Sequence, residues 1–335
     1  MMEAPDINWL IKMSIRLSVL IICAGVLCVT ASAQEPSSAS TDQNTTASER
    51  SADSGYTRKG ADTCAMCHDE DGKFPVYPIY RTKHAQPADN RTPFGGLQCE
   101  SCHGPGENHA KFVQPGEKQA AIITFGKHSN LTVPQQNQIC LECHSGQDRV
   151  AWYASAHDSN DVACVTCHKI HASHDPVLTT RDQPEVCYQC HKKVRADFLK
   201  TSVHPVRFGK MTCSECHQTH GTSTTAMVTQ PTVNQTCYTC HEDKRGPLLW
   251  EHAPVTENCS ICHSPHGSVQ PALLKKRAPL LCQQCHSQLG HPSVPRSTNS
   301  LPNANPSAYL LTGSCMNCHS QIHGSNHPSG AKLMR

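Results

Sequence analysis

Apolar residues cluster in one stretch near the N-terminus. Leu17 to Val29 is a largely apolar run of 13 residues, which is too short to span a bilayer as a helix of about 20 residues. The basic residues Lys12 and Arg16 precede this run, and the small residues Ala31 to Ala33 follow it. A basic segment, a short apolar segment and a small-residue cleavage site make up a secretory signal peptide, so residues 1–33 are predicted to be one.

Two other interpretations of this stretch remain open. A lipid anchor on Cys23 or Cys28 is disfavoured, because Ile22 and Leu27 stand where a small residue is expected. An uncleaved membrane anchor is disfavoured by the shortness of the apolar run. No other segment of the chain approaches transmembrane length. The mature chain is therefore expected to be exported and soluble.

Polar residues dominate the rest of the chain. Residues 34–59 are rich in Ser, Thr, Ala, Asp and Gln and are predicted to be a disordered linker. Aromatic residues make up only 5% of the chain, which also contains 23 prolines and 19 glycines. Residues 60–335 therefore have too few apolar side chains for an ordinary core. They are predicted to be mostly coil with short α-helices and almost no β-sheet, around something that supplies the missing apolar surface.

A five-residue pattern, C-x-x-C-H, occurs ten times after the signal peptide. The ten copies use 20 of the 22 cysteines, and the other two lie in the signal peptide. The motif cysteines are Cys64, Cys67, Cys99, Cys102, Cys140, Cys143, Cys164, Cys167, Cys187, Cys190, Cys213, Cys216, Cys237, Cys240, Cys259, Cys262, Cys282, Cys285, Cys315 and Cys318. The motif histidines are His68, His103, His144, His168, His191, His217, His241, His263, His286 and His319.

Haem attachment explains this pattern better than three other uses of paired cysteines. A disulfide framework neither fixes this spacing nor needs a histidine after every second cysteine. A zinc protein combines C-x-x-C units in twos, without a histidine at one fixed offset. A thioredoxin-like motif occurs once, beside a βαβ pattern that this chain lacks. In c-type attachment two thiols bind the porphyrin and the histidine binds its iron, so ten covalently attached c-type haems are predicted.

The haems would be crowded, because the chain offers little protein for each of them. From Cys64 to Arg335 there are 272 residues, or about 27 for each of ten haems. Neighbouring macrocycles must then touch or nearly touch, and the polypeptide forms a thin wrapping around an extended wire of haems. The haems would also supply the apolar surface that the side chains lack.

The 13 histidines outside the motifs follow an internal repeat. The motifs form five units, and each unit reads motif, middle histidine, motif, trailing histidine. The middle histidines are His84, His157, His204, His252 and His291. The trailing histidines are His109, His171, His220, His266 and His323. These ten are the candidate second axial ligands, and His128, His174 and His327 are left over, with His174 an alternative to His171 and His327 an alternative to His323.

A trailing histidine is expected to bind a haem other than the one beside it. In "CSECHQTHG", His217 would bind its own haem from the near side. His220 lies three residues further on and cannot pass around the macrocycle to the far side. The trailing histidines would therefore cross-link haems. The sequence does not indicate which histidine serves which haem.

Two imidazoles on each iron leave no open position for a substrate. Chemistry at a haem iron needs an exchangeable ligand and a shaped distal pocket. All ten motifs end in histidine, and the candidate second ligands are sufficient for ten irons. The chain is therefore predicted to transfer electrons and not to be an enzyme.

The charge balance gives no reason to expect a nucleic acid as partner. The formal net charge is +2, far from the strongly basic balance of nucleic-acid-binding proteins. Two propionates on each haem would make the loaded protein acidic. Many Lys and Arg side chains are therefore expected to pair with propionates.

The sequence resembles the DmsE/MtrA type of decahaem c-type cytochromes. The resemblance rests on ten motifs in five units, on "CHGPGENHA" (102–110) and on "CMNCHSQIHGSNHPSG" (Cys315–Gly330), and it covers the chain from about residue 60 onward. It implies a periplasmic protein associated with the outer membrane and inserted into a β-barrel porin. It further implies exchange of electrons with periplasmic cytochromes on one side. On the other side it implies extracellular donors or acceptors, including metals and an extracellular multihaem cytochrome.

Two other functions remain open from the sequence. A soluble periplasmic electron shuttle would need the same haems but no porin. A multihaem reductase would need one iron that lacks a second protein ligand. The conduit agrees with one physical constraint, because an exported chain of this kind can cross a bilayer only inside a closed barrel. Neither the direction of electron flow nor the terminal donor or acceptor follows from the residues.

Overall fold

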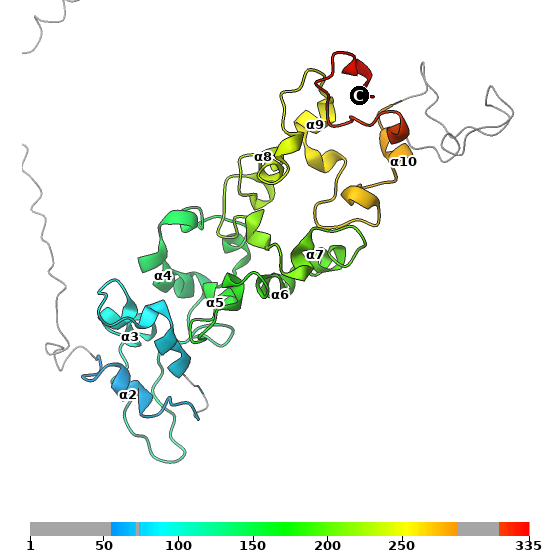
Figure 1. The fold of residues 1–335 in the computed structure, drawn as a ribbon. Coiled ribbons are helices and arrows are strands. Elements are labelled where there is room, and N and C mark those ends of the chain that lie inside the picture. The colour runs from blue at the N-terminus through cyan, green and yellow to red at the C-terminus, as the bar shows by residue number, and fades with distance from the viewer. Residues whose placement is uncertain (1–54, 72–73, 75, 287–314, 335) are drawn as a thin grey trace, which may run out of the picture. The chain divides into compact units, whose positions relative to one another are not determined.

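The computed structural model describes residues 55–71, 74, 76–286 and 315–334, drawn in colour in Figure 1. The predicted signal peptide, most of the predicted linker and His291 lie outside the described residues. The α-helices are α2 (Ala61–Ala65), α3 (Glu100–His103), α4 (Val133–His144), α5 (Cys164–Cys167), α6 (Gln183–Tyr188), α7 (Lys192–Asp197), α8 (Val233–Tyr238), α9 (Ala253–Glu257) and α10 (Ala278–Cys282).

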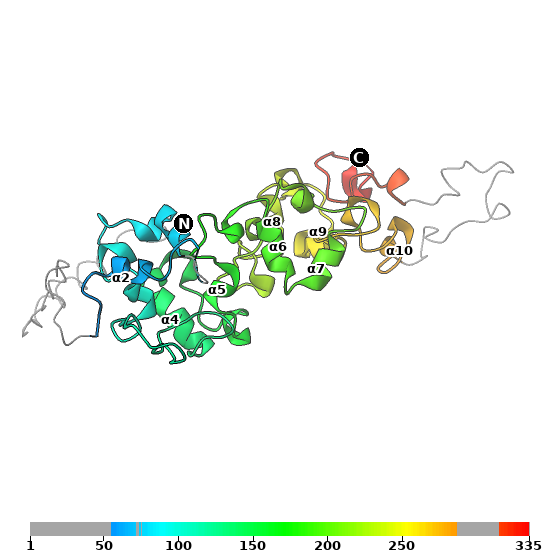
Figure 2. The same ribbon diagram turned by 90° about the horizontal axis from the view of Figure 1, so that it is seen from below.

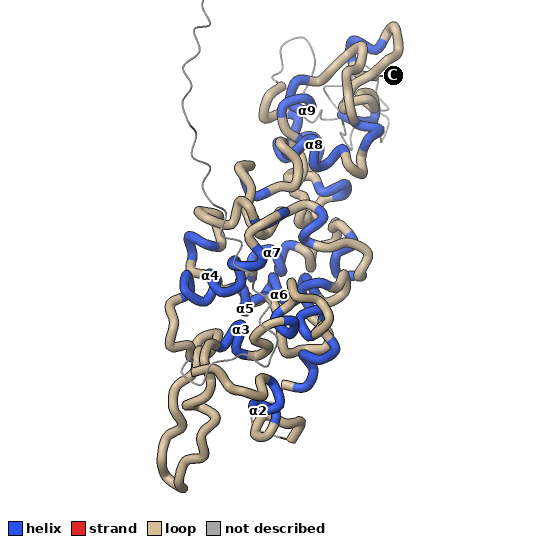
Figure 3. The backbone as a smooth tube through the Cα atoms, turned by 90° about the vertical axis from the view of Figure 1, so that its left-hand side faces the viewer, coloured by secondary structure: helices blue, strands red, loops and turns tan. Residues whose placement is uncertain are grey.

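Single turns of 3-10 helix account for most of the other ordered backbone. They are Tyr77–Arg81, Lys83–Ala85, Pro93–Gly95, Gln147–Arg149, Asp158–Asn160, Pro176–Leu178, Pro205–Phe208, Cys213–Glu215, Thr225–Met227, Glu242–Lys244, Cys259–Ile261, Pro271–Leu273, Cys315–Asn317 and Gly330–Lys332. Within the described ranges there is no β-strand, only four isolated bridges, and loops dominate (Figure 3). This confirms the predicted fold class.

The motifs account for the shortness of the helices. In each motif outside α4, the backbone N–H of the histidine donates to the carbonyl of the first cysteine, four residues earlier, as at His68 and Cys64 (3.0 Å). One helical turn puts residues three apart on the same face, so both sulfurs of a motif point the same way. The helix is needed for only that turn. Longer α4 begins at a capping box between Thr132 and Gln135.

The side chains form only small apolar clusters. Ala61, Ala85 and Phe94 make one, and Tyr188 with Phe198 and neighbours makes another. No described side chain is completely buried. This absence fits the expectation that cofactors, not side chains, supply most of the apolar interior.

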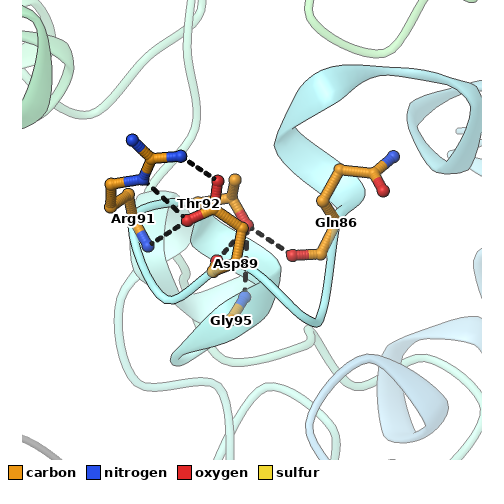
Figure 4. Close-up of polar contacts among 5 residues, drawn as sticks. All are labelled: Gln86, Asp89, Arg91, Thr92 and Gly95. Atoms are coloured by element: carbon orange, nitrogen blue, oxygen red, sulfur yellow. Dashed lines mark hydrogen bonds and ion pairs between the residues drawn. The ribbon is translucent and has the colours of Figure 1, made fainter.

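A compact turn holds the segment that carries the middle histidine of the first unit (Figure 4). The Thr92 hydroxyl donates to the carbonyls of Gln86 (2.7 Å) and Asp89 (2.9 Å) and accepts from the Gly95 amide (3.3 Å). Arg91 donates three hydrogen bonds to the Asp89 carboxylate, which lower the pKa of Asp89 to about 2. A side chain at Gly95 would collide with the Asp89 backbone.

Consecutive elements of the chain are neighbours in space. The described residues belong to one compact unit, in which α4 packs on α5, α6 on α7, and α10 on Cys315–Asn317. Figure 2 shows these neighbouring helices from a second side. None of the described helices has the length and apolar character needed to cross a bilayer.

At the N-terminal end of the described residues, the Thr57 amide and hydroxyl donate to the buried Glu100 carboxylate (2.9 and 2.8 Å).

Candidate functional site

The two motifs of each unit meet at their first cysteines. Cys64 shares a hydrogen bond with Cys99, and that bond is the largest cause of the raised pKa of Cys64. The equivalent cysteines of the other units share the same contact: Cys140 with Cys164, Cys187 with Cys213, Cys237 with Cys259, and Cys282 with Cys315. These cysteines would therefore hold the two haems of a unit as neighbours.

The second cysteines connect one unit to the next. Burial and the nearby thiols of Cys140 and Cys143, in the second unit, raise the pKa of Cys102 to about 11. The thiols of the next unit act in the same way at the later junctions. Cys187 helps to raise the pKa of Cys167, Cys240 that of Cys216, and Cys285 that of Cys262. The ten attachment sites therefore form one uninterrupted series in sequence order.

Nine motif histidines each face one of the candidate second ligands. The ring centroids of these pairs are 5.8 to 6.3 Å apart. The pairs are His68 with His109, His144 with His84, His103 with His171, His191 with His157, His168 with His220, His241 with His204, His217 with His266, His286 with His252, and His263 with His323. Of the ten candidates, only His291 is outside the described residues.

The spacing of these rings fits one iron between each pair. An imidazole nitrogen binds a first-row metal at about 2 Å and lies roughly 1 Å from the ring centre, so two opposed ligands put their ring centroids about 6 Å apart. Direct ring stacking without an intervening atom would not produce the same distance at interplanar angles as different as 11° and 79°. The donor set and its spacing therefore fit a haem iron with two axial imidazoles.

The pairing follows a rule that interlocks the units. A middle histidine faces the first motif of the next unit, as His204 of the third unit faces His241 of the fourth (6.3 Å). A trailing histidine faces the second motif of the preceding unit, as His220 of the third unit faces His168 of the second (6.2 Å). The first unit has no predecessor, and its trailing histidine, His109, faces its own first motif. Each junction between units thus contains two facing pairs, each built from both units.

At three junctions the middle histidine is also oriented by the opposing unit. Its Nδ1 donates to the carbonyl of the residue just before the trailing histidine. The three hydrogen bonds join His157 to Thr219 (2.8 Å), His204 to Pro265 (2.8 Å) and His252 to Ile322 (3.0 Å). A bond at Nδ1 fixes the tautomer and turns Nε2 toward the partner ring. The same hydrogen bond therefore joins two units and orients a candidate ligand.

The histidines of the second motifs have a similar support. Nδ1 of each one faces an acceptor that lies later in the chain: Ile123 O for His103 (2.7 Å), Asp175 Oδ2 for His168 (2.7 Å), Ala226 O for His217 (2.9 Å), Ala272 O for His263 (2.7 Å) and Lys332 O for His319 (2.7 Å). Four acceptors are backbone carbonyls and one is a carboxylate. In the third and fourth units the carbonyl belongs to a residue with positive φ, Ala226 (57°) or Ala272 (54°).

Burial lowers the pKa of four of the five trailing histidines. Desolvation is the largest cause of the lowered pKa of His171, His220, His266 and His323, and the nearby histidines lower it further. Only a neutral imidazole has a lone pair for a metal. The lowered pKa therefore favours the neutral, metal-binding form of these four rings.

A continuous, mostly apolar cavity follows the attachment sites. Its volume is about 3670 Å³, and it is lined by the cysteines and histidines of the fourth to tenth motifs and by the described candidate second ligands that face them. A pocket for one drug-sized ligand measures about 300–1,000 Å³. The cavity thus has room for several large flat cofactors in contact with one another.

Comparison with known proteins agrees with this geometry. A model described as a doubled CXXCH motif matches residues 204–246 and 252–291, and one described as an NrfB-like cytochrome c-type protein matches residues 99–184. The multihaem cytochrome MtrA of Shewanella baltica is 46% identical over 292 residues, which cover 87% of this chain and 86% of that protein. The chain belongs to the MtrA family of multihaem cytochromes. It carries covalently bound c-type haems and is an electron-transfer protein, not an enzyme.

Two more distant relatives match parts of the MtrA-type chain. The cytochrome c-type protein NrfB of Haemophilus influenzae is 29% identical over 115 residues, which cover 32% of this chain and 50% of that protein. NrfB of Escherichia coli is 27% identical over 141 residues, which cover 40% of this chain and 66% of that protein. The likeness is consistent with a protein built from repeated units.

Buried amide side chains join the two motifs of a unit in this MtrA-type cytochrome, and sequence reasoning missed them. The Asn234 side chain accepts from the Cys259 amide (2.7 Å) and donates to the carbonyls of Val255 (2.8 Å) and Thr256 (3.1 Å). Asn137 makes the equivalent bonds in the second unit, to the Cys164 amide and the Val162 carbonyl, and Gln183 joins the motifs of the third. The signal was present in the repeated letters N-Q-x-C at 137–140 and 234–237.

Glycines after three trailing histidines let the units approach closely. Side chains at Gly221 and Gly267 would collide with the backbone oxygens of Ala151 and Asp197 in the preceding unit. Gly324 lies against Leu248 and Trp250 in the same way. Such close backbone approach requires glycine. In the first and second units the residue after the trailing histidine is alanine.

The three leftover histidines face no motif histidine. The exposed ring of His174 contacts the carboxylate of Asp182 (3.1 Å), which lowers the pKa of Asp182. His327 lies in a turn, where its Nδ1 accepts from the Ser329 amide (3.2 Å) and its carbonyl accepts from Trp250 Nε1 (2.9 Å). His128 is exposed. The geometry therefore favours His171 over His174, and His323 over His327, as second ligands.

Proposed function

We propose that the nine facing pairs each bind one haem iron and that His291 completes the tenth site with His319. The assignment of the nine pairs rests on ring centroid distances of 5.8 to 6.3 Å. The tenth follows by elimination, because His291 is the one remaining candidate in the sequence repeat. The protein would then hold ten haems, each attached through its two motif cysteines.

The protein's own residues restrict these irons to electron transfer. Two imidazoles per iron exclude water and substrates from the metal. Haem supplies a one-electron Fe(III)/Fe(II) couple. The hydrogen bonds to Nδ1, as at His204 and His217, hold the rings in one orientation, so little has to move when an electron arrives or leaves.

We further propose that the protein carries electrons across the outer membrane, inside a β-barrel porin, between periplasmic cytochromes and extracellular donors or acceptors. The observation that supports a conduit is the unbroken series of attachment sites, in which every motif lies beside the next one. A wire needs such a series, with no gap that an electron must cross through protein alone. The porin, the periplasmic location and an extracellular multihaem cytochrome as partner come from the family resemblance.

Two measurements test this function. The first is purification of the haem-loaded protein from detergent-solubilised outer membranes, in which a stoichiometric β-barrel protein should co-purify. The second is reconstitution of that complex into vesicles that enclose a redox dye. A reductant added outside should then reduce the dye, and vesicles with the barrel alone should show no reduction. A haem protein found only in the soluble periplasmic fraction, with no barrel bound, would contradict the conduit and favour a shuttle.

The number of haems has its own test. The mass of the mature protein should exceed that of its polypeptide by ten haems, and the oxidised protein should show only low-spin iron. Fewer than ten covalent haems, or one iron that is high-spin, would contradict the ligand assignment.

A further inference from the structure

The second unit supplies an acceptor unlike those of the other four units. Nδ1 of His168 faces the Asp175 carboxylate at 2.7 Å, whereas Nδ1 of the other second-motif histidines faces a backbone carbonyl. A carbonyl presents a partial charge, and a carboxylate presents a full negative charge. The hydrogen bond to a carboxylate is the stronger of the two.

The Asp175 carboxylate is not neutralised by an ion pair with a Lys or Arg of the described residues. The Asp175 side chain is only 14% exposed, and its second oxygen accepts from the Lys169 amide (3.2 Å). The Lys169 ammonium group donates instead to the carbonyls of Val165 (3.1 Å) and Thr166 (3.4 Å). In the described part of the chain, no Lys or Arg forms an ion pair with Asp175.

We propose that Asp175 lowers the reduction potential of the haem attached at Cys164 and Cys167 below that of the haems on the other second motifs. The inference rests on the proposed binding of this iron by His168. A carboxylate that accepts from the distant nitrogen of a metal-bound imidazole makes the other nitrogen a stronger donor. A stronger donor stabilises Fe(III) relative to Fe(II), and hydrogen bonding of this kind is one of the ways a protein sets a haem potential. Asp175 is thus a positioning residue that acts through His168.

The position of this haem gives the effect a consequence for electron flow. Its reduction takes one electron from a neighbouring haem or from an added one-electron reductant, converts Fe(III) to Fe(II), and makes or breaks no bond. Cys167 lies beside Cys187 and Cys190 of the next unit, so the fourth haem stands between three attachment sites and six. A low reduction potential at the fourth haem creates an energetically uphill step for an electron that passes through it. Electrons therefore equilibrate faster within the three haems before it, and within the six after it, than between these two groups.

A redox titration of the haem-loaded protein tests the proposal. Asp175→Asn keeps an oxygen that can accept from Nδ1 and removes the charge. We expect one tenth of the haem absorbance to become reducible about tenfold more easily, because loss of such a partner typically changes metal affinity by about 10–100-fold. A tenfold change is about 59 mV for a one-electron couple. Asp175→Glu should restore most of the wild-type curve.

Asp182→Asn is the matched control. It removes the same charge from a nearby carboxylate whose histidine partner, His174, faces no motif histidine. Its titration curve should match that of the wild type. Superimposable curves for Asp175→Asn and wild type, or an equal shift in the control, would overturn the proposal. A high-spin haem in Asp175→Asn would also overturn it, by assigning Asp175 the task of holding the ring. A high-spin haem in the wild type would instead contradict the ligand assignment.

Discussion

The junction between the first and second units differs from the three that follow it. At the later junctions the middle histidines His157, His204 and His252 each donate through Nδ1 to the opposing unit. At the first junction His84 faces His144 at 5.9 Å, but the described residues offer no hydrogen-bond acceptor to Nδ1 of either ring. The trailing histidine there is followed by alanine, whereas a glycine follows it at the later junctions.

This difference shows that two histidine rings can face each other without the hydrogen bond that orients one of them. The facing rings are present at all four junctions, so the interlocking rule does not depend on the hydrogen bond or on the glycine. Those two features belong to a tighter contact, in which backbones of adjacent units touch. At the last two junctions this contact extends to paired backbone hydrogen bonds, between Ser202 and Ser268 (2.9 and 2.9 Å) and between Trp250 and Ser325 (2.8 and 2.8 Å). The first junction should therefore be the most easily opened.

Removal of a ligand at a tight junction should have the largest effect. His204→Ala takes away the second ligand proposed for the haem of the motif that ends at His241, so one tenth of the iron should change from low-spin to high-spin. Electron paramagnetic resonance of the oxidised protein measures this fraction. His174→Ala is the control, because its ring faces Asp182 and no motif histidine. An unchanged spectrum of His204→Ala would show that His204 is not a ligand.

Addition of a side chain at a tight junction should come next. Gly267→Ala forces a Cβ against the backbone of Asp197 at a φ of 154°. Overpacking and backbone strain each cost roughly 1–3 kcal/mol, so we expect the free energy of unfolding to fall by about 3 kcal/mol. The position after the trailing histidine of the second unit is already alanine, and Ala172→Gly should cost less than about 1 kcal/mol. Equal losses in denaturant titrations of the two variants would show that the junctions do not differ.

Loss of a buried amide within a unit should cost somewhat less. Asn234→Ala leaves the Cys259 amide and two carbonyls without their partner, and unsatisfied buried groups cost about 1–3 kcal/mol. We expect a loss of about 2 kcal/mol in the free energy of unfolding. Asn160→Ala, at an exposed asparagine that bonds only the nearby Ala156 carbonyl, should change it by less than about 0.5 kcal/mol. The explanation fails if both variants unfold at the same denaturant concentration.

Replacement of a second histidine ligand by added cyanide should show the smallest difference between the junctions. Cyanide should displace His84 at a concentration about tenfold lower than it needs to displace His157, His204 or His252, because a ligand without its hydrogen-bond partner binds about 10–100-fold more weakly. The optical change of the haem that faces His84 should therefore come before the changes of those three haems in a cyanide titration. In His84→Ala this site is already open and should bind cyanide before all the others. A wild-type titration with a single phase would contradict the distinction between the junctions.

The sequence predicted which histidines come together better than it predicted which one each of them faces. Every described motif histidine other than His319 faces one of the ten histidines that the repeat singled out, and the short helices follow from the C-x-x-C-H turn. The partners could not be predicted, because the repeat does not tell that His220 reaches back to His168 instead of toward a haem of its own unit. That choice depends on how successive units pack.

The supporting residues were harder to predict for a different reason. Asn234 and Gln183 do the same task with different side chains and at different distances from the next cysteine, so no single spacing marks them. The carbonyls that orient the second-motif histidines carry no side-chain signal at all. The repeated N-Q-x-C and the glycine after a trailing histidine, as at Gly267, could have been noticed as recurring letters, but the meaning of the glycine depends on the backbone it meets.

The interlocking of units has one most direct test. A structure of the haem-loaded protein that resolves the ligands should show the His220 ring bound to the iron of the haem on Cys164 and Cys167, in the preceding unit. It should likewise show His204 on the haem of Cys237 and Cys240, in the following unit. His220 bound to the haem on Cys213 and Cys216, or bound to no iron, would contradict the account.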